Sequence, residues 1–127
     1  MKNESGYITA LSIIMTLIIL SVMVYNAKLL MSERLFLQAR EVWFQTSLHL
    51  QSGRKDLISK VRYEEEINDG DFGTFIYPDG RVNYFTTKLS DAIYVFRLEV
   101  RLNKSGSAIG LLYYDYVKNE VVKWVVV

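Results

Sequence analysis

Cysteine is absent from the 127-residue sequence, and histidine and proline occur once each. Without cysteine, the chain can form neither a disulfide framework nor a thiolate metal site. The single histidine, His49, has no second histidine and no cysteine with which to build a zinc site or a nucleophile–base pair. We therefore expect a non-enzymatic protein with no catalytic residues, no metal and no cofactor.

A strong excess of charge is also lacking, because 15 lysines and arginines face 14 acidic residues, giving a net charge of +1. This near balance disfavours a strongly nucleic-acid-binding protein. One group of residues has the right chemistry for phosphate contacts and base stacking, namely Arg54, Lys55, Lys60, Arg62, Tyr63, Phe75 and Tyr84. The acidic cluster next to it cancels much of its field, so direct contact of the protein with nucleic acid is kept only as a disfavoured alternative.

That acidic cluster consists of Glu64, Glu65, Glu66, Asp69 and Asp71. Oxygen-rich loops bind calcium, but this spacing lacks the alternation of ligands found in an EF-hand. We interpret the cluster as a solvated helix end followed by a turn.

Charged residues are missing altogether from Tyr7 to Ala27. The 18 residues Tyr7–Val24 would form a helix of roughly 27 Å, close to the minimum that crosses a bilayer core, and the next three residues lengthen it. Tyr7 and Tyr25 stand where aromatic rings favour the membrane interface. We predict a retained membrane-spanning helix over residues 7–27, because the bulky Tyr25 does not suit the cleavage site of an ordinary secretory signal. The charges of the two flanks are equal and give no orientation.

Glycine and proline are absent from Tyr7 to Ser52, so this stretch can form one helix of about 68 Å. Beyond the membrane exit, apolar residues recur every seven positions: Leu29/Leu30, Phe36/Leu37, Trp43/Phe44 and Leu50. A stripe of this kind packs on the protein's own sheet or on a neighbouring helix. We expect the second half to pack on the sheet and Leu29–Leu37 to remain available to neighbours.

Gly53 is a plausible helix C-cap, and a short second helix is predicted from Arg54 to about Glu66. After Asp69-Gly70 the pattern is typical of β-structure. In Pro78-Asp79-Gly80 we expect the proline to preset one turn angle and the glycine to adopt a positive φ. Strands are predicted over residues 72–77, 81–87, 93–102, 108–116 and 121–127.

The strand over residues 93–102 alternates between apolar and charged side chains. Tyr94, Phe96, Leu98 and Val100 are expected to face the helix at Trp43 and Phe44. The predicted fold class is α+β, with a long N-terminal helix packed on a small antiparallel β-meander.

A short polar leader, residues 1–6, ends at Gly6 immediately before the apolar segment. This junction resembles the cleavage and assembly segment of type IV prepilins and pseudopilins. More narrowly, the chain resembles the competence minor pseudopilins of the ComGG type from Gram-positive bacteria. The resemblance rests on the acid-free start Gly6–Leu11, the strand-turn segment Tyr77–Tyr84 and the ending Tyr114–Trp124.

The resemblance implies that a prepilin peptidase cuts after Gly6 on the cytoplasmic side and leaves Tyr7 as the new, often methylated, N-terminus. Most members of the family carry a glutamate at the fifth mature position, which here is Leu11. Without that acid, the subunit is not expected to dock beneath an earlier subunit. It can still offer its Tyr7 amine to the glutamate of a later subunit. The resemblance therefore implies a pilin-like head over residues 28–127 outside the membrane and a position at the pilus tip.

The resulting functional hypothesis is a minor pilin that helps to initiate or cap a competence type IV pilus for DNA uptake in transformation. Its partners would be other major and minor pilins, the prepilin peptidase and the membrane. A type II secretion minor pseudopilin and an uncleaved, single-pass membrane-anchored binding protein remain as alternatives.

Overall fold

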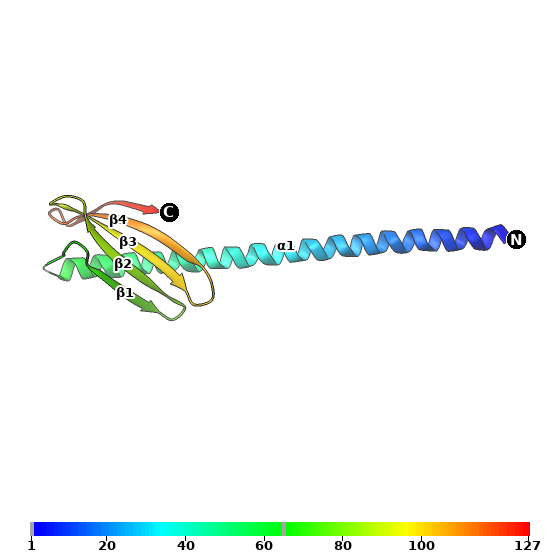
Figure 1. Cartoon of the computed structure of the whole chain (residues 1–127), viewed down its shortest axis with the longest axis horizontal. Coiled ribbons are helices and arrows are strands. Elements are labelled where there is room, and N and C mark those ends of the chain that lie inside the picture. The colour runs from blue at the N-terminus through cyan, green and yellow to red at the C-terminus, as the bar shows by residue number, and fades with distance from the viewer. Residues whose placement is uncertain (1, 65) are drawn as a thin grey trace. The chain divides into compact units, whose positions relative to one another are not determined.

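The computed structural model describes residues 2–64 and 66–127, which form one helix and five strands (Figure 1). The elements are α1 (Lys2–Tyr63), β1 (Phe72–Tyr77), β2 (Gly80–Lys88), β3 (Ile93–Leu102), β4 (Ser107–Asp115) and β5 (Glu120–Val126). Two compact units divide the chain, Met1–Arg40 and Glu41–Val127, and the second contains the end of α1 together with the whole sheet. The predicted α+β, pilin-like fold class is confirmed.

Helix α1 continues through Gly53 to Tyr63, so the predicted helix end at Gly53 is wrong. Gly53 does not adopt the positive φ of a C-cap glycine. It is buried against Val82 of β2, where a β-carbon on the glycine would lie 2.8 Å from Val82 Cγ1. The glycine thus permits a close approach of helix to strand, and the two helices predicted from the sequence are one.

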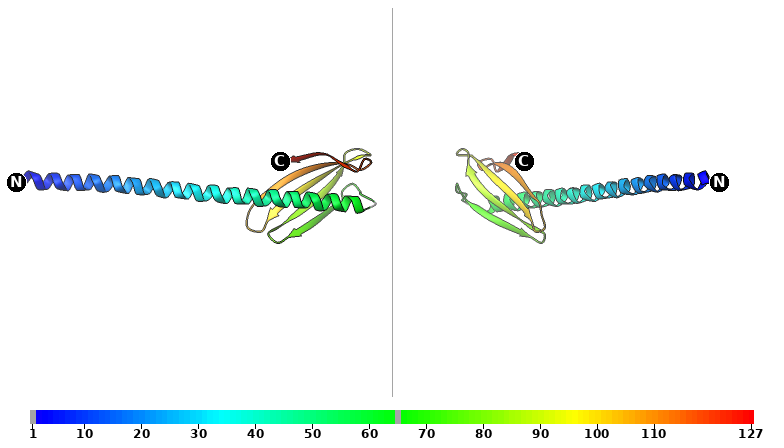
Figure 2. Two further views of the ribbon diagram at one scale, coloured as in Figure 1. Left: turned by 180° about the vertical axis from the view of Figure 1, so that it is seen from behind. Right: turned by 45° about the vertical axis from the view of Figure 1, so that its right-hand side comes forward.

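The five strands form one antiparallel sheet whose spatial order follows the sequence, β1-β2-β3-β4-β5. The predicted bounds of β1 and β3 match the structure, and those of the other strands differ by one residue at each end. The last part of α1 crosses one face of this sheet (Figure 2). We call that side the inner face and the opposite side the outer face.

Backbone conformation at the turns follows the sequence at some positions only. Gly70 and Gly106 have positive φ angles of 86° and 129°, and Asn119 adopts φ 59° in the last turn. Gly80 does not have a positive φ, so that expectation is wrong. A β-carbon at Gly80 would lie 2.7 Å from the carbonyl oxygen of Arg101, and this close strand contact is what requires glycine.

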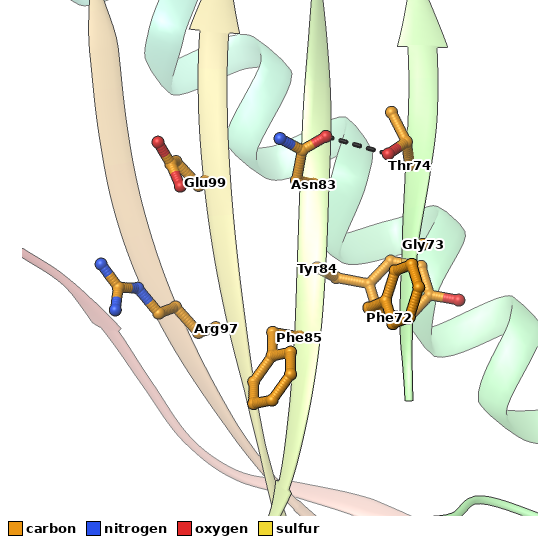
Figure 3. Close-up of a pocket in the computed structure, with 8 residues that line it drawn as sticks. All are labelled: Phe72, Gly73, Thr74, Asn83, Tyr84, Phe85, Arg97 and Glu99. Carbon is orange, nitrogen blue, oxygen red and sulfur yellow. Dashed lines mark hydrogen bonds between the residues drawn. The ribbon is translucent and has the colours of Figure 1, made fainter. Parts of the chain in front are cut away.

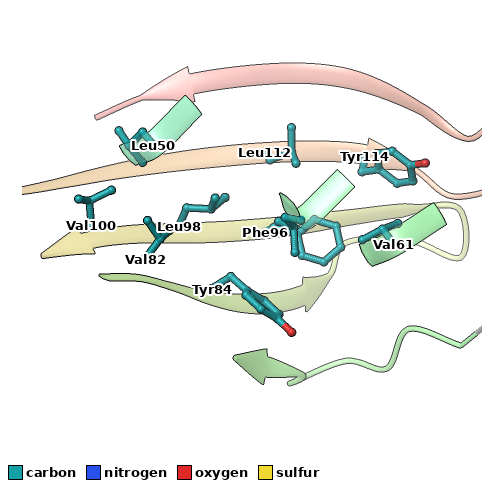
Figure 4. Packing of buried hydrophobic residues seen from close by; sticks show 10 residues of the cluster. Leu50, Val61, Val82, Tyr84, Phe96, Leu98, Val100, Leu112 and Tyr114 are labelled. Carbon is teal, nitrogen blue, oxygen red and sulfur yellow. The ribbon is translucent and has the colours of Figure 1, made fainter. Parts of the chain in front are cut away.

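The core lies between α1 and the inner face of the sheet (Figure 4). Phe96, Leu98 and Val100 are buried while Arg97 and Arg101 are exposed, which confirms the alternation predicted for β3. Each such apolar side chain stabilises the fold by roughly 1.5–3 kcal/mol relative to leaving it exposed. From the helix, the buried apolar side chains of the core are Leu50, Leu57 and Val61.

Trp43 and Phe44 do not join this core, contrary to the prediction. They are 69% and 57% exposed, whereas Leu50, seven residues after Trp43, is 2% exposed. At that level of the helix the β3–β4 turn lies over other side chains, because a β-carbon on Gly106 would meet Val42 Cγ1 at 2.5 Å. The heptad spacing identifies a face of the helix but does not show where along that face the sheet ends.

Candidate assembly segment and surfaces of the head

The N-terminal part of α1 is uncovered along its whole described length. Every residue from Glu4 to Arg40 is exposed, and within the described chain α1 is the one helix long and apolar enough to cross a membrane. None of its most apolar stretch is buried inside the structure. Such a surface is stable only in an apolar surrounding, so this segment indicates single-pass membrane anchoring.

Hydroxyl groups inside the apolar segment are satisfied by the helix itself. Thr9 Oγ1 donates to the carbonyl of Ser5, Thr16 Oγ1 to that of Ser12, and Ser21 Oγ to that of Leu17, each at 2.8 Å. These bonds connect residues four positions apart and need no partner outside the helix. The three polar side chains therefore do not prevent the segment from lying in hydrocarbon, where an unpaired hydroxyl is costly.

The predicted site residues lie on the surface of this segment. Gly6 lies within α1, and a β-carbon on it would meet no side chain and no backbone atom from outside its own stretch of helix within 4 Å. Tyr7 is 69% exposed and Leu11 is 45% exposed, one turn further along the helix. Leu29, Phe36 and Leu37 are also exposed, as expected for residues that remain available to neighbours.

The basic and aromatic group considered for nucleic-acid contact is largely engaged within the head. Lys60 Nζ donates to Tyr84 Oη at 2.5 Å, lies 5.1 Å from the centre of the Tyr84 ring and is 3.4 Å from Glu64. The hydrogen bond to Tyr84 raises the pKa of Lys60, a shift that burial partly opposes and nearby Glu64 supports. Phe75 stacks on the Tyr84 ring at 5.4 Å, so neither ring is free to stack on a base.

Arg54 from the same group lies over the Trp124 ring, 5.5 Å from its centre. The Arg54 side chain therefore makes a cation–π contact with an aromatic ring of β5 within the same head. Tyr63, in contrast, is 87% exposed at the end of α1. The structure does not assemble this group into one surface.

His49 and Tyr77 form one of the contacts between α1 and the edge strand β1. Their rings meet edge to face with centres 5.5 Å apart, and His49 Nδ1 is 2.8 Å from the carbonyl oxygen of Gln45. The Tyr77 hydroxyl donates to Asp56. Burial of the phenol is the main cause of the raised pKa of Tyr77, and the hydrogen bond to Asp56 raises this pKa further. His49 thus packs at the boundary of the core.

Two residues of the acidic cluster hold the loop that follows α1. Asp69 Oδ1 accepts from the backbone N–H of Lys88 at 2.8 Å, and Asp71 Oδ2 accepts from that of Asn68 at 2.9 Å. Among the described residues, no three acidic or histidine side chains gather as metal ligands. Glu65, part of the predicted cluster, lies outside the described residues.

A single apolar N-terminal helix that continues onto a five-stranded antiparallel meander defines a pilin-like membrane subunit. Comparison with protein families supports this class of protein and identifies the family within it. Residues 30–125 match the ComGG family, described as ComG operon protein 7. The chain belongs to the ComGG family and is thus a structural, pilin-like protein of a competence operon. No curated protein and no solved structure matches the chain.

Proposed function

We propose that this protein is a minor pilin that helps to initiate or cap a competence type IV pilus used for DNA uptake in transformation. The observation that carries the proposal is the uncovered apolar stretch of α1 after Gly6 in a member of the ComGG family. Its function is association: residues 7–27 pack among the apolar helices of other pilins, and residues 28–127 form the head outside the cytoplasmic membrane. No chemical conversion is involved.

Processing after Gly6 is the first step of this proposal. The prepilin peptidase must reach the backbone at the scissile bond, and glycine, which has no side chain, obstructs this approach least. Cleavage removes residues 1–6 and creates a free amine on Tyr7. That amine becomes a positive charge at the end of an apolar helix, where it attracts an acid from a neighbouring subunit.

Leu11 sets the place of the subunit in the assembly. A buried glutamate at this position would need a charged partner, and the amine of an earlier subunit supplies one in the family that this chain resembles. With Leu11 the subunit has no acid to pair with the amine of a subunit nearer the tip. It keeps its Tyr7 amine, which can pair with the glutamate of the subunit added next. This asymmetry supports a position at the tip, where no subunit lies above.

N-terminal analysis of the membrane-extracted protein tests the proposal. A mature chain that begins at Tyr7 supports it, and an intact Met1 in cells that contain the peptidase contradicts it. Gly6→Val should leave an uncut precursor in the membrane, whereas Ser5→Val, which adds the same side chain one position earlier, should still be cut. Loss of pilus and of transformation on deletion, with recovery by the wild-type gene, tests the function itself.

A further inference from the structure

The outer face of the sheet carries a row of side chains that is most exposed at its β1–β2 end and half-buried at Leu111 and Val125. Successive backbone pairings across the five strands align Phe72, Phe85, Arg97, Leu111 and Val125 in one line. Phe72 and Phe85 stand directly opposite each other and are 80% and 49% exposed. Two adjacent phenylalanine rings open to solvent form a flat apolar platform that the core of the head does not use.

A shallow groove of about 520 Å³ lies along this platform. Its outer-face walls are Phe72, Thr74, Asn83, Phe85, Arg97 and Glu99, which point away from α1 in Figure 3. Thr74 Oγ1 donates to Asn83 Oδ1 at 2.9 Å, so the Asn83 amide nitrogen faces the groove side with its donors unused by that bond. The groove thus combines aromatic surface, an amide and a guanidinium group within reach of one another.

Positive charge dominates the same face. Arg81, Arg97, Arg101 and Lys123 are exposed there, and the acidic side chain among them, Glu99, is paired with Arg101 at 2.8 Å. Arg81 and Arg101 are direct partners across β2 and β3. Because Glu99 already compensates Arg101, Arg81 and Arg97 are the guanidinium groups of this face that remain for a bound anion. The near-neutral charge of the whole chain hides this local excess, because the acidic residues lie mainly on the helix and in its following loop.

We propose that the outer face binds single-stranded nucleic acid, with bases stacked on Phe72 and Phe85 and phosphates held by Arg97 and Arg81. Sequence-tolerant binding of single strands combines a positive surface with exposed aromatic rings, and this face has both. A duplex keeps its base faces stacked inside, so it can use the arginines but not the rings. The inference rests on the proposed role in DNA uptake for its biological setting, and it adds the surface that contacts the strand.

Fluorescence anisotropy with a labelled oligothymidine and the full-length protein in zwitterionic detergent micelles tests the proposal. About three unpaired cations on the face predict a slope near −2 for log affinity against log salt concentration. Phe72→Ala and Phe85→Ala should each weaken binding by roughly fivefold to a hundredfold. Arg97→Gln should weaken binding and make the slope shallower by about 0.7.

Matched controls come from the other side of the head. Tyr63 is 87% exposed and Arg62 is exposed beside it at the end of α1, so Tyr63→Ala and Arg62→Gln remove the same chemistry elsewhere and should leave binding unchanged. Absence of binding by the wild type, or equal losses in the controls, would overturn the proposal. A duplex bound as tightly as the single strand, with no effect of the phenylalanine changes, would overturn it as well.

Two further outcomes separate this inference from the proposed function. If the outer-face variants bind the oligonucleotide normally but fail to recruit other pilins, the face is a protein interface and the inference is wrong. If oligonucleotide binding behaves as expected while deletion of the protein leaves pili and transformation intact, the proposed function fails and the binding face stands.

Discussion

Gly53 of α1 lies directly against Val82 of β2, so that a β-carbon on the glycine would approach Val82 Cγ1 to 2.8 Å and its other two side-chain carbons to 3.2 Å. Gly53→Ala should therefore destabilise the head, although alanine favours a helix by about 1 kcal/mol over glycine. Overpacking a stiff, fully buried valine costs roughly 1–3 kcal/mol, so we expect a net loss of about 1 kcal/mol. Urea unfolding of the full-length protein in detergent measures this difference.

Val82→Ala provides the control for that clash. By itself it should destabilise the head by leaving a cavity, but in combination with Gly53→Ala the loss should be smaller than the sum of the two single changes. Additive losses would mean that the two residues do not press on each other.

Phe96 and Trp43 should differ sharply in their contribution to stability. Phe96 is 2% exposed in the centre of the core, so Phe96→Ala should cost roughly 3–5 kcal/mol, a large part of the stability of a small domain. Trp43 is 69% exposed, and Trp43→Ala should change the unfolding free energy by less than about 0.5 kcal/mol. Thermal unfolding monitored by circular dichroism compares the two, and equal losses would contradict the packing described here.

Tyr77 should make the head less stable in alkali. Because its pKa in the folded state is raised, its contribution is fully present below the unfolded value of about 10 and is lost as the pH rises above it. The unfolding free energy of the wild type should therefore fall more steeply above pH 10 than that of Tyr77→Phe. Tyr63→Phe, at an 87% exposed position, should follow the wild type. Parallel curves for Tyr77→Phe and the wild type would contradict the assignment.

Leu11→Glu tests the position at the tip. If no subunit lies above this one, an added acid gains no partner and keeps its cost of insertion, about 2.5–3.5 kcal/mol on translocon scales. Pilus number, counted by immunofluorescence, should stay the same or fall. Blocking the Tyr7 amine should in contrast weaken recruitment of the next acid-bearing pilin. More pili in the Leu11→Glu strain, or labelling of this subunit along the shaft, would rule out the tip position while leaving the pilin assignment intact.

The sequence predicts the parts of this fold that depend on local pattern. The bounds of β3 follow from strict alternation around Phe96 and Leu98, and those of β1 from the turn residues at its ends. Gly53 was misread as a helix end because a rule for local conformation contains no information about Val82, 29 residues away. Trp43 was placed in the core because its spacing from Leu50 is right, although the sheet does not reach it.

The candidate sites divide in the same way. The apolar segment after Gly6 can be recognised from the sequence because hydropathy is averaged over consecutive residues of the chain. The row from Phe72 to Val125 joins residues from five strands and becomes visible only when the register of all four pairings is known. Lys60 and Tyr84, grouped for nucleic-acid contact in the sequence, bond to each other in the structure.

The sequential order of the strands also determines how the head can form. Each strand pairs with the one made just before it, so every hairpin can close over a short loop with little loss of chain entropy. Short sequence separation between contacting residues is associated with rapid folding. Each strand after β1 therefore pairs with a strand that precedes it in the sequence, and in the folded head Trp124 of β5 lies over Gly110 of β4. The head can thus assemble progressively behind its membrane helix without waiting for a distant segment.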